Sequence, residues 1–136
     1  MGITPHKQGI TIGFNCQFNV STTDTQARIL VGDYATGGFG LLTDDNLLYG
    51  VSYKNNVEYN TLILSTITPT GTYSVQGIYL PGESMIYYYL GGIPKGTITN
   101  NLPETNMQYF YMRLQTYDNN PKTLNVFRYI ISENGW

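Results

Sequence analysis

Apolar and polar residues alternate along much of this chain with a period of two, which is the period of side chains on a β-strand. The clearest run extends from Ile10 to Phe18, where every second residue is apolar. Nowhere do apolar residues recur at the i, i+3, i+4, i+7 spacing of an amphipathic helix. The pattern therefore predicts an all-β protein with helix limited to a turn or so. Strands are predicted over residues 9–19, 27–32, 38–43, 46–53, 59–67, 71–79, 84–90, 107–117 and 123–131.

Turn-forming residues separate these strands. Asp-Asp-Asn at 44–46, Lys-Asn-Asn at 54–56 and Pro-Gly at 81–82 supply positive φ, fixed φ or hydrogen bonds from side chain to backbone. Many short strands at this spacing indicate an antiparallel sandwich or barrel. Residues 93–106 carry the weakest strand pattern, so a long loop is predicted there, with at most one short strand near Thr97–Thr99.

The composition agrees with this class. The 136 residues make one domain over 1–136, either alone or as the C-terminal module of a longer chain. Only 12% of the residues are charged, and uncharged polar residues take their place, as is typical of secreted or virion β proteins and of sugar binders. The net charge is −2 and the basic residues are dispersed, which argues against nucleic-acid binding. No apolar run reaches the roughly 20 residues that span a bilayer, so no membrane insertion is expected.

The order of the apolar segments adds a further indication. It rests on the opening strand 10–18, the segments 28–32, 37–42 and 47–53, the hairpin 73–92 and the closing segment 124–131. Together they resemble the concanavalin A-like jelly roll, in particular its laminin-G-like and phage-fibre relatives. The resemblance implies an antiparallel jelly-roll β-sandwich whose last strand returns beside the first. It also implies an oligomeric module at a virion surface or on an extracellular appendage.

Catalytic chemistry finds little support in the sequence. Glycoside hydrolysis usually needs two carboxyl groups that face one bond. Glu58, Glu83, Glu104 and Glu133 are isolated, and each lies in or near a predicted turn. The glycosidase branch of the resembled family carries a Glu-x-Asp-x-Glu strand pattern, which is absent here. A non-enzymatic protein is therefore expected, with a glycan-active hydrolase as an alternative.

Metal and thiol chemistry are also poorly supported. A single histidine, His6, and a single cysteine, Cys16, cannot build a transition-metal site. Cys16 falls on the apolar face of the first strand, where a buried, unreactive thiol is expected. Asp44, Asp45 and Asp118 are candidate oxygen ligands for a loop calcium, but hairpin turns explain the same residues. No metal and no cofactor are therefore expected.

The 13 tyrosines are the remaining candidates for function. Tyrosine combines a large apolar ring with a hydroxyl, which favours protein interfaces and stacking on sugars. Alternation places Tyr109, Tyr111 and Arg113 on one face of their strand, opposite an apolar face. It likewise places Tyr87 and Tyr89 together on one face of an earlier strand. If the two strands are neighbours, the five side chains form one aromatic strip.

Such a strip has two classes of partner. It suits protein contacts, with other copies of the chain or with neighbouring virion proteins, and it suits stacking on a cell-surface glycan. Cross-strand aromatic packing that only stabilises the sheet is a third reading. The sequence thus predicts a non-enzymatic virion or appendage module with an adhesion or glycan-binding role. A purely architectural capsid or tail protein without a ligand is the alternative.

Overall fold

The computed structural model describes residues 9–18, 25–33, 37–68, 71–103, 110–116 and 124–133. These residues form β-strands and one 3-10 turn. Within them there is no helix of the length and apolar character needed to span a membrane. The elements are β1 (Ile10–Phe18), β2 (Thr25–Asp33), β3 (Gly37–Asp44), β4 (Leu47–Lys54), β5 (Val57–Leu64), β6 (Thr72–Leu80), η1 (Pro81–Glu83), β7 (Met85–Leu90), β8 (Ile93–Ile98), β9 (Phe110–Thr116) and β10 (Leu124–Glu133). Each predicted strand has a counterpart among them, so the all-β prediction is confirmed.

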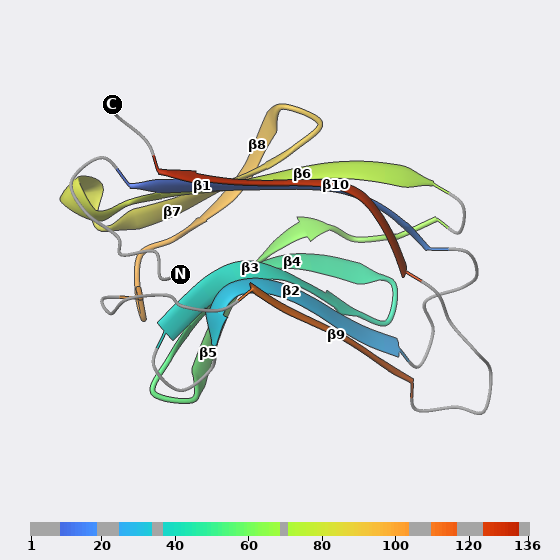
Figure 1. Ribbon diagram of the computed structural model, residues 1–136, viewed down its shortest axis with the longest axis horizontal. Helices are drawn as coiled ribbons and strands as arrows, with labels where there is room; N and C mark the ends of the chain where they lie inside the picture. The colour runs from blue at the N-terminus through green and yellow to red at the C-terminus, as the bar shows by residue number, and fades with distance from the viewer. Residues whose placement is uncertain are drawn as a thin grey trace.

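The strands form two antiparallel sheets that face each other (Figure 1). Sheet I has the order β10-β1-β6-β7-β8, and sheet II has the order β5-β4-β3-β2-β9. The last strand, β10, returns beside the first, so that Ile131 lies opposite Ile12. The molecule is therefore a jelly-roll sandwich of the concanavalin A-like type, as the resemblance implied.

The prediction of a loop over 93–106 was wrong for its first part. Strand β8 pairs with β7 and forms one edge of sheet I. An edge strand tolerates Pro94, because the missing N–H is not needed on the outer side. Gly96 lets β8 approach β5 closely, since a Cβ there would lie 2.3 Å from the Thr61 hydroxyl oxygen. Tertiary pairing thus overrides the weak strand propensity of Pro94, Lys95 and Gly96.

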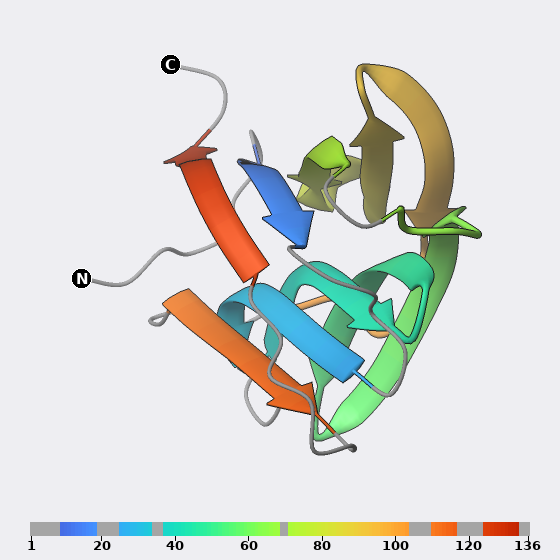
Figure 2. The ribbon, with the colours of Figure 1, turned by 90° about the vertical axis from the view of Figure 1, so that its right-hand side faces the viewer.

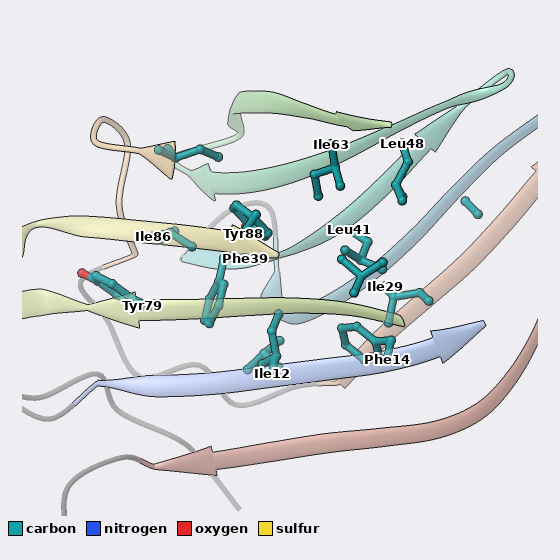
Figure 3. Packing of buried hydrophobic residues seen from close by; sticks show 14 of the residues in the cluster. Ile12, Phe14, Ile29, Phe39, Leu41, Leu48, Ile63, Tyr79, Ile86 and Tyr88 are labelled. Carbon is teal, nitrogen blue, oxygen red and sulfur yellow. The ribbon is translucent and has the colours of Figure 1, made fainter. Parts of the chain in front are cut away.

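The core lies between the two sheets (Figure 3). On β1 the predicted alternation is confirmed, because Ile10, Ile12, Phe14 and Cys16 are at most 5% exposed. The side chain of Phe18, predicted on the same face, lies outside the described residues. The remaining buried side chains of this core are Ala27, Ile29, Val31, Phe39, Leu41, Leu48, Ile63, Ile67, Val75, Tyr79, Ile86, Tyr88 and Ile98.

Sheet II is arched, and its concave face turns away from sheet I (Figures 1 and 2). The Tyr88 ring projects from sheet I against Gly50 of sheet II, where a Cβ would lie 2.5 Å from the ring. The Tyr88 hydroxyl donates a hydrogen bond of 2.7 Å to the Val51 carbonyl. This side chain therefore ties the convex side of the arch to the opposite sheet and satisfies its own buried hydroxyl.

The thiol of Cys16 is expected to be inert in the folded protein. Burial raises its pKa from 9.0 to about 11, and the thiolate is the reactive form. Labelling by a thiol reagent should therefore be slow until the domain unfolds, when it should become fast. Cys16→Ser is expected to cost about 1–3 kcal/mol in a chemical unfolding experiment, because a hydroxyl replaces an apolar group in the core. Rapid native-state labelling would show that the register of β1 is wrong.

Candidate functional site

The structure separates the residues that the sequence proposed as one site. Tyr87 and Tyr89 lie on β7 in sheet I, on the face opposite the buried Ile86 and Tyr88. Strand β9 lies at the edge of sheet II. The two strands are therefore not neighbours, and the single aromatic strip is not formed.

The other three proposed residues belong to β9 or to the segment before it. Arg113 is exposed and lies opposite Arg28 of β2. Tyr109 lies outside the described residues. Tyr111 pairs with Leu30 in the backbone register, but its side chain lies outside the described part of the structure. Arg113 is thus the one of the three whose side chain the structure describes.

A second, smaller apolar cluster covers the concave face of sheet II. On β2 and β3 its members directly follow the core residues Ile29 and Leu41, so they point to the opposite side of the sheet. They are Leu30, Leu42, Val51 and Tyr53, with Tyr49 packed against them. The four named first are at most 4% exposed. The concave face therefore has an apolar floor that is well packed although it lies outside the sandwich.

Polar side chains form a hydrogen-bonded chain over this floor. Gln26 Nε2 donates to Asp44 Oδ1 at 3.2 Å, and Arg28 Nη1 donates to Gln26 Oε1 at 3.1 Å. Arg28 Nε donates to the Tyr53 hydroxyl oxygen at 3.1 Å. The Tyr53 hydroxyl in turn donates to Glu58 Oε1 at 2.7 Å. One continuous chain thus links side chains from β3, β2, β4 and β5.

Glycines in β3 give Arg28 room to reach Tyr53. Strand β3 lies between β2 and β4, and its residues Gly38 and Gly40 carry no side chain on the concave face. Gly40 is also required by the backbone, because a Cβ there would lie 2.0 Å from the Ile29 carbonyl oxygen. The absence of side chains in the middle of the face allows the guanidinium to cross the intervening strand.

Burial and the neighbouring charges fix the protonation of Tyr53. Burial is the largest cause that raises the pKa of its hydroxyl, and the hydrogen bond to Glu58 raises it further, while Arg28 acts in the opposite direction. The hydroxyl therefore stays protonated at neutral pH. It must donate to the Glu58 carboxylate and accept from Arg28, which gives the chain one fixed direction.

Glu58 lies close to a turn, as the sequence predicted, and its carboxylate is bound by a side chain of the neighbouring strand. Glu58 lies in β5 opposite Tyr53 and accepts its hydrogen bond. The turn before it holds two residues with positive φ, Asn55 at 52° and Asn56 at 61°, which is the geometry of a type I′ hairpin. A two-residue loop over Asn55-Asn56 sets Lys54 opposite Val57 and hence Tyr53 opposite Glu58. The sequence carried this signal in its Asn-Asn pair.

An apolar patch and an amide continue the concave face beside this chain. Half-buried Tyr49 lies opposite Leu62, which is 46% exposed. Asn60 lies between them and Glu58 on β5, is exposed, and faces Val51. The face thus offers an exposed carboxylate, an amide and an aromatic ring with an apolar neighbour.

The residues considered for calcium form a hairpin turn. Asp45 has φ 51° in the turn between β3 and β4, and its backbone N–H donates to the Thr25 carbonyl at 2.9 Å. Asp44 accepts a hydrogen bond from Gln26. Among the described residues no three His, Cys, Asp or Glu side chains gather as a metal site, and Asp118 lies outside them. Turn geometry accounts for Asp44 and Asp45.

Comparison with known proteins gives a likeness of structure only. No family model matches the sequence, and no curated protein does. Sheep galectin-11 in complex with glycerol matches with a TM-score of 0.63 at 9% identity, over 97% of this chain and 95% of that chain. A Bacillus licheniformis beta-glucanase matches with a TM-score of 0.71 at 13% identity, over 95% and 67%. A Caenorhabditis elegans galectin matches with a TM-score of 0.63 at 7% identity, over 98% and 89%. At these identities the likeness establishes the jelly-roll fold.

Proposed function

We propose that this domain binds glycan on the concave face of sheet II and does so without chemical turnover. The observation that carries the proposal is the chain formed by Arg28, Tyr53 and Glu58 over the apolar floor. Sugars present hydroxyl groups and apolar ring faces together. A site for them needs a few fixed polar groups beside aromatic or apolar surface, and this face offers both.

Each group on the face has a defined part in the proposal. Glu58 accepts from Tyr53 through one oxygen, and a carboxylate has further acceptor positions for sugar hydroxyls. Asn60 adds an amide that both donates and accepts. Tyr49 and Leu62 supply the apolar surface on which a sugar ring packs. Exposed Arg113 extends the face at its β9 edge, where it suits ligand oxygens.

The structural neighbours support carbohydrate as the ligand class. Two of them are galectins, and one galectin complex contains glycerol, a small polyol. The glucanase neighbour fits the alternative of a glycan-active hydrolase. In this chain the two carboxylates of the hydrogen-bonded chain, Asp44 and Glu58, stand at its opposite ends. Binding without turnover is therefore the form of the proposal.

The low charge and the resemblance to fibre modules suggest the biological setting. We place the domain at a virion surface or on an extracellular appendage. There it acts in adhesion, and it assembles with copies of itself or with neighbouring virion proteins. Both parts of this setting are testable by localisation and by the mass of the assembled protein.

Glu58→Gln is expected to weaken glycan binding by about tenfold or more, because it removes the charge from a carboxylate that accepts hydrogen bonds. A glycan array identifies the ligand, and calorimetric titration then compares the variants. Glu83→Gln is the matched control. Glu83 also accepts a hydrogen bond from a tyrosine, Tyr87, at 2.6 Å, but it lies in η1 beside sheet I, so this variant should bind normally.

Three results would count against the proposal. If no glycan is retained, the architectural alternative gains support. If a glycan is cleaved and Glu58→Gln abolishes the cleavage, the hydrolase alternative replaces binding without turnover. If both Glu→Gln variants bind like the parent protein, the ligand does not use the concave face.

A further inference from the structure

The outer face of sheet I carries a depression of about 260 Å³, on the opposite side of the sandwich from the concave face of sheet II. Its side chains come from three adjacent strands, β10, β1 and β6. Backbone register arranges them in two rows, with Arg128, Asn15 and Ser74 in the first row and Ile130, Gly13 and Gln76 in the second.

Gly13 opens this depression. It sits in the middle of the second row, so that row has no side chain between those of Ile130 and Gln76. The backbone does not require glycine at this position, because an added Cβ would meet only the Val75 carbonyl oxygen, at 3.9 Å. By contrast, a Cβ at Gly40 or Gly50 would come within 2.0 or 2.5 Å of other atoms. A glycine within a strand weakens that strand, and no close contact at Gly13 requires one. Packing therefore does not explain the open space at this position.

The polar side chains around the depression are not engaged with other described residues. No described residue forms a hydrogen bond or ion pair with the side chains of Asn15, Ser74, Gln76 or Arg128. On the concave face of sheet II, in contrast, donors and acceptors satisfy one another. The depression therefore presents a guanidinium, two amides and a hydroxyl whose bonding capacity is open to a ligand.

The backbone directs Arg128 toward this depression. Arg128 pairs with Asn15, but the next residue of β1, Cys16, pairs with Val126. Strand β10 therefore has one extra residue at this point, which is a β-bulge. Such a bulge re-aims the side chains beside it. Among the described residues no carboxylate lines the depression, and the charged group that does so is a cation, Arg128, suited to an anionic oxygen. Half-buried Tyr89 continues the second row beyond Gln76 and offers a ring beside the polar groups.

We propose that this depression is a second ligand site, which binds an acidic saccharide through Arg128. The anionic group is a carboxylate or a sulfate. Arg128 holds it in a charge-assisted hydrogen bond, and Asn15, Ser74 and Gln76 bind the neighbouring hydroxyls. The volume suits one or two sugar residues rather than a long chain, being just below the range of about 300–1,000 Å³ for small-molecule pockets. The site does not depend on the function proposed for sheet II.

Calorimetric titration with three oligosaccharides tests the site. Hyaluronan tetrasaccharide carries carboxylates only, chondroitin sulfate tetrasaccharide carries both groups, and chitotetraose is neutral. At least one acidic probe should bind at millimolar concentration or tighter, and more tightly than chitotetraose. Preference between the two acidic probes identifies the anionic group. Equal binding of all three, or no binding of either acidic probe, would overturn the proposal.

Two variants locate the binding. Arg128→Gln should weaken binding of the acidic oligosaccharide by about tenfold or more, because a charge-assisted hydrogen bond is lost. Gly13→Val should abolish binding by filling the depression while the melting temperature stays equal or rises, because valine favours strands. If Gly13→Val folds poorly, Gly13→Ala supplies a smaller obstruction with the same expected direction. Glu83→Gln, in η1 and outside the lining of the depression, should leave this binding unchanged. Unchanged binding in both the Arg128 and the Gly13 variants would refute the site.

Discussion

Replacing Tyr88 by alanine is expected to lower the free energy of unfolding by about 3–5 kcal/mol, the range for truncating a large buried aromatic side chain. Tyr88 is 1% exposed and lies within the core (Figure 3). Its ring fills the space over two glycines, Gly50 of sheet II and Gly77 of sheet I, where a Cβ would lie 2.5 and 3.1 Å from the ring. The substitution therefore opens a cavity between the sheets that neither glycine can fill. Chemical unfolding followed by circular dichroism measures the loss.

Two further variants separate the contributions of the ring and the hydroxyl. Tyr88→Phe keeps the ring but leaves the Val51 carbonyl without the hydroxyl that bonds it at 2.7 Å, so a smaller loss of about 1–3 kcal/mol is expected. Gly50→Ala keeps Tyr88 but forces its ring away from the new methyl group, at a cost of about 1–3 kcal/mol. If Tyr88→Ala costs less than Tyr88→Phe, the ring does not hold the sheets together in this way.

Alkaline pH is expected to destabilise the domain steeply. Burial raises the pKa of Cys16 from 9.0 to about 11, and it also raises the pKa of Tyr53 and of Tyr88 above the ordinary value of 10.0. Between the unfolded and folded pKa values, the unfolded chain loses protons that the folded protein keeps. The unfolded state is then favoured by about 1.4 kcal/mol per pH unit for each such group. These three groups should therefore leave stability unchanged below about pH 9 and lower it above, first through Cys16 and from about pH 10 through the tyrosines as well.

Unfolding by denaturant at a series of pH values tests this dependence, and tyrosinate absorbance reports the ionisation directly. Tyr53→Phe should reduce the slope above pH 10, because phenylalanine has no proton to lose. If absorbance shows that Tyr53 and Tyr88 ionise while the protein stays folded and equally stable, the two hydroxyls are accessible to solvent and the prediction is wrong.

Local pattern was sufficient for the strands and much of the core. On β1 the period of two identified Ile10, Ile12, Phe14 and Cys16 as one buried face, because each alternate residue of a strand meets the same environment. The resemblance also implied the return of β10 beside β1. The loop predicted over 93–106 shows the limit of this reasoning, since β8 forms only because β7 offers an edge and β5 leaves space beside Gly96.

The candidate sites depended on which strands share a sheet, and no local pattern states that. Tyr87 and Arg113 each follow the expected alternation, yet they belong to different sheets, because sheet membership is decided by pairing between segments distant in sequence. The link from Arg28 to Tyr53 spans 25 residues and crosses a third strand. Only its last step, from Tyr53 to Glu58, was readable from the Asn55-Asn56 turn.

The sequence by itself therefore determined the class of fold, most strand positions and the buried face of the first strand, all of which follow from side-chain alternation and turn chemistry acting over a few residues. Only the tertiary structure decided the arched shape of sheet II, the polar chain on its concave face and the depression above Gly13. These features arise where side chains from three or four strands meet, and their meeting depends on long-range register and on glycines whose neighbours lie elsewhere in the chain.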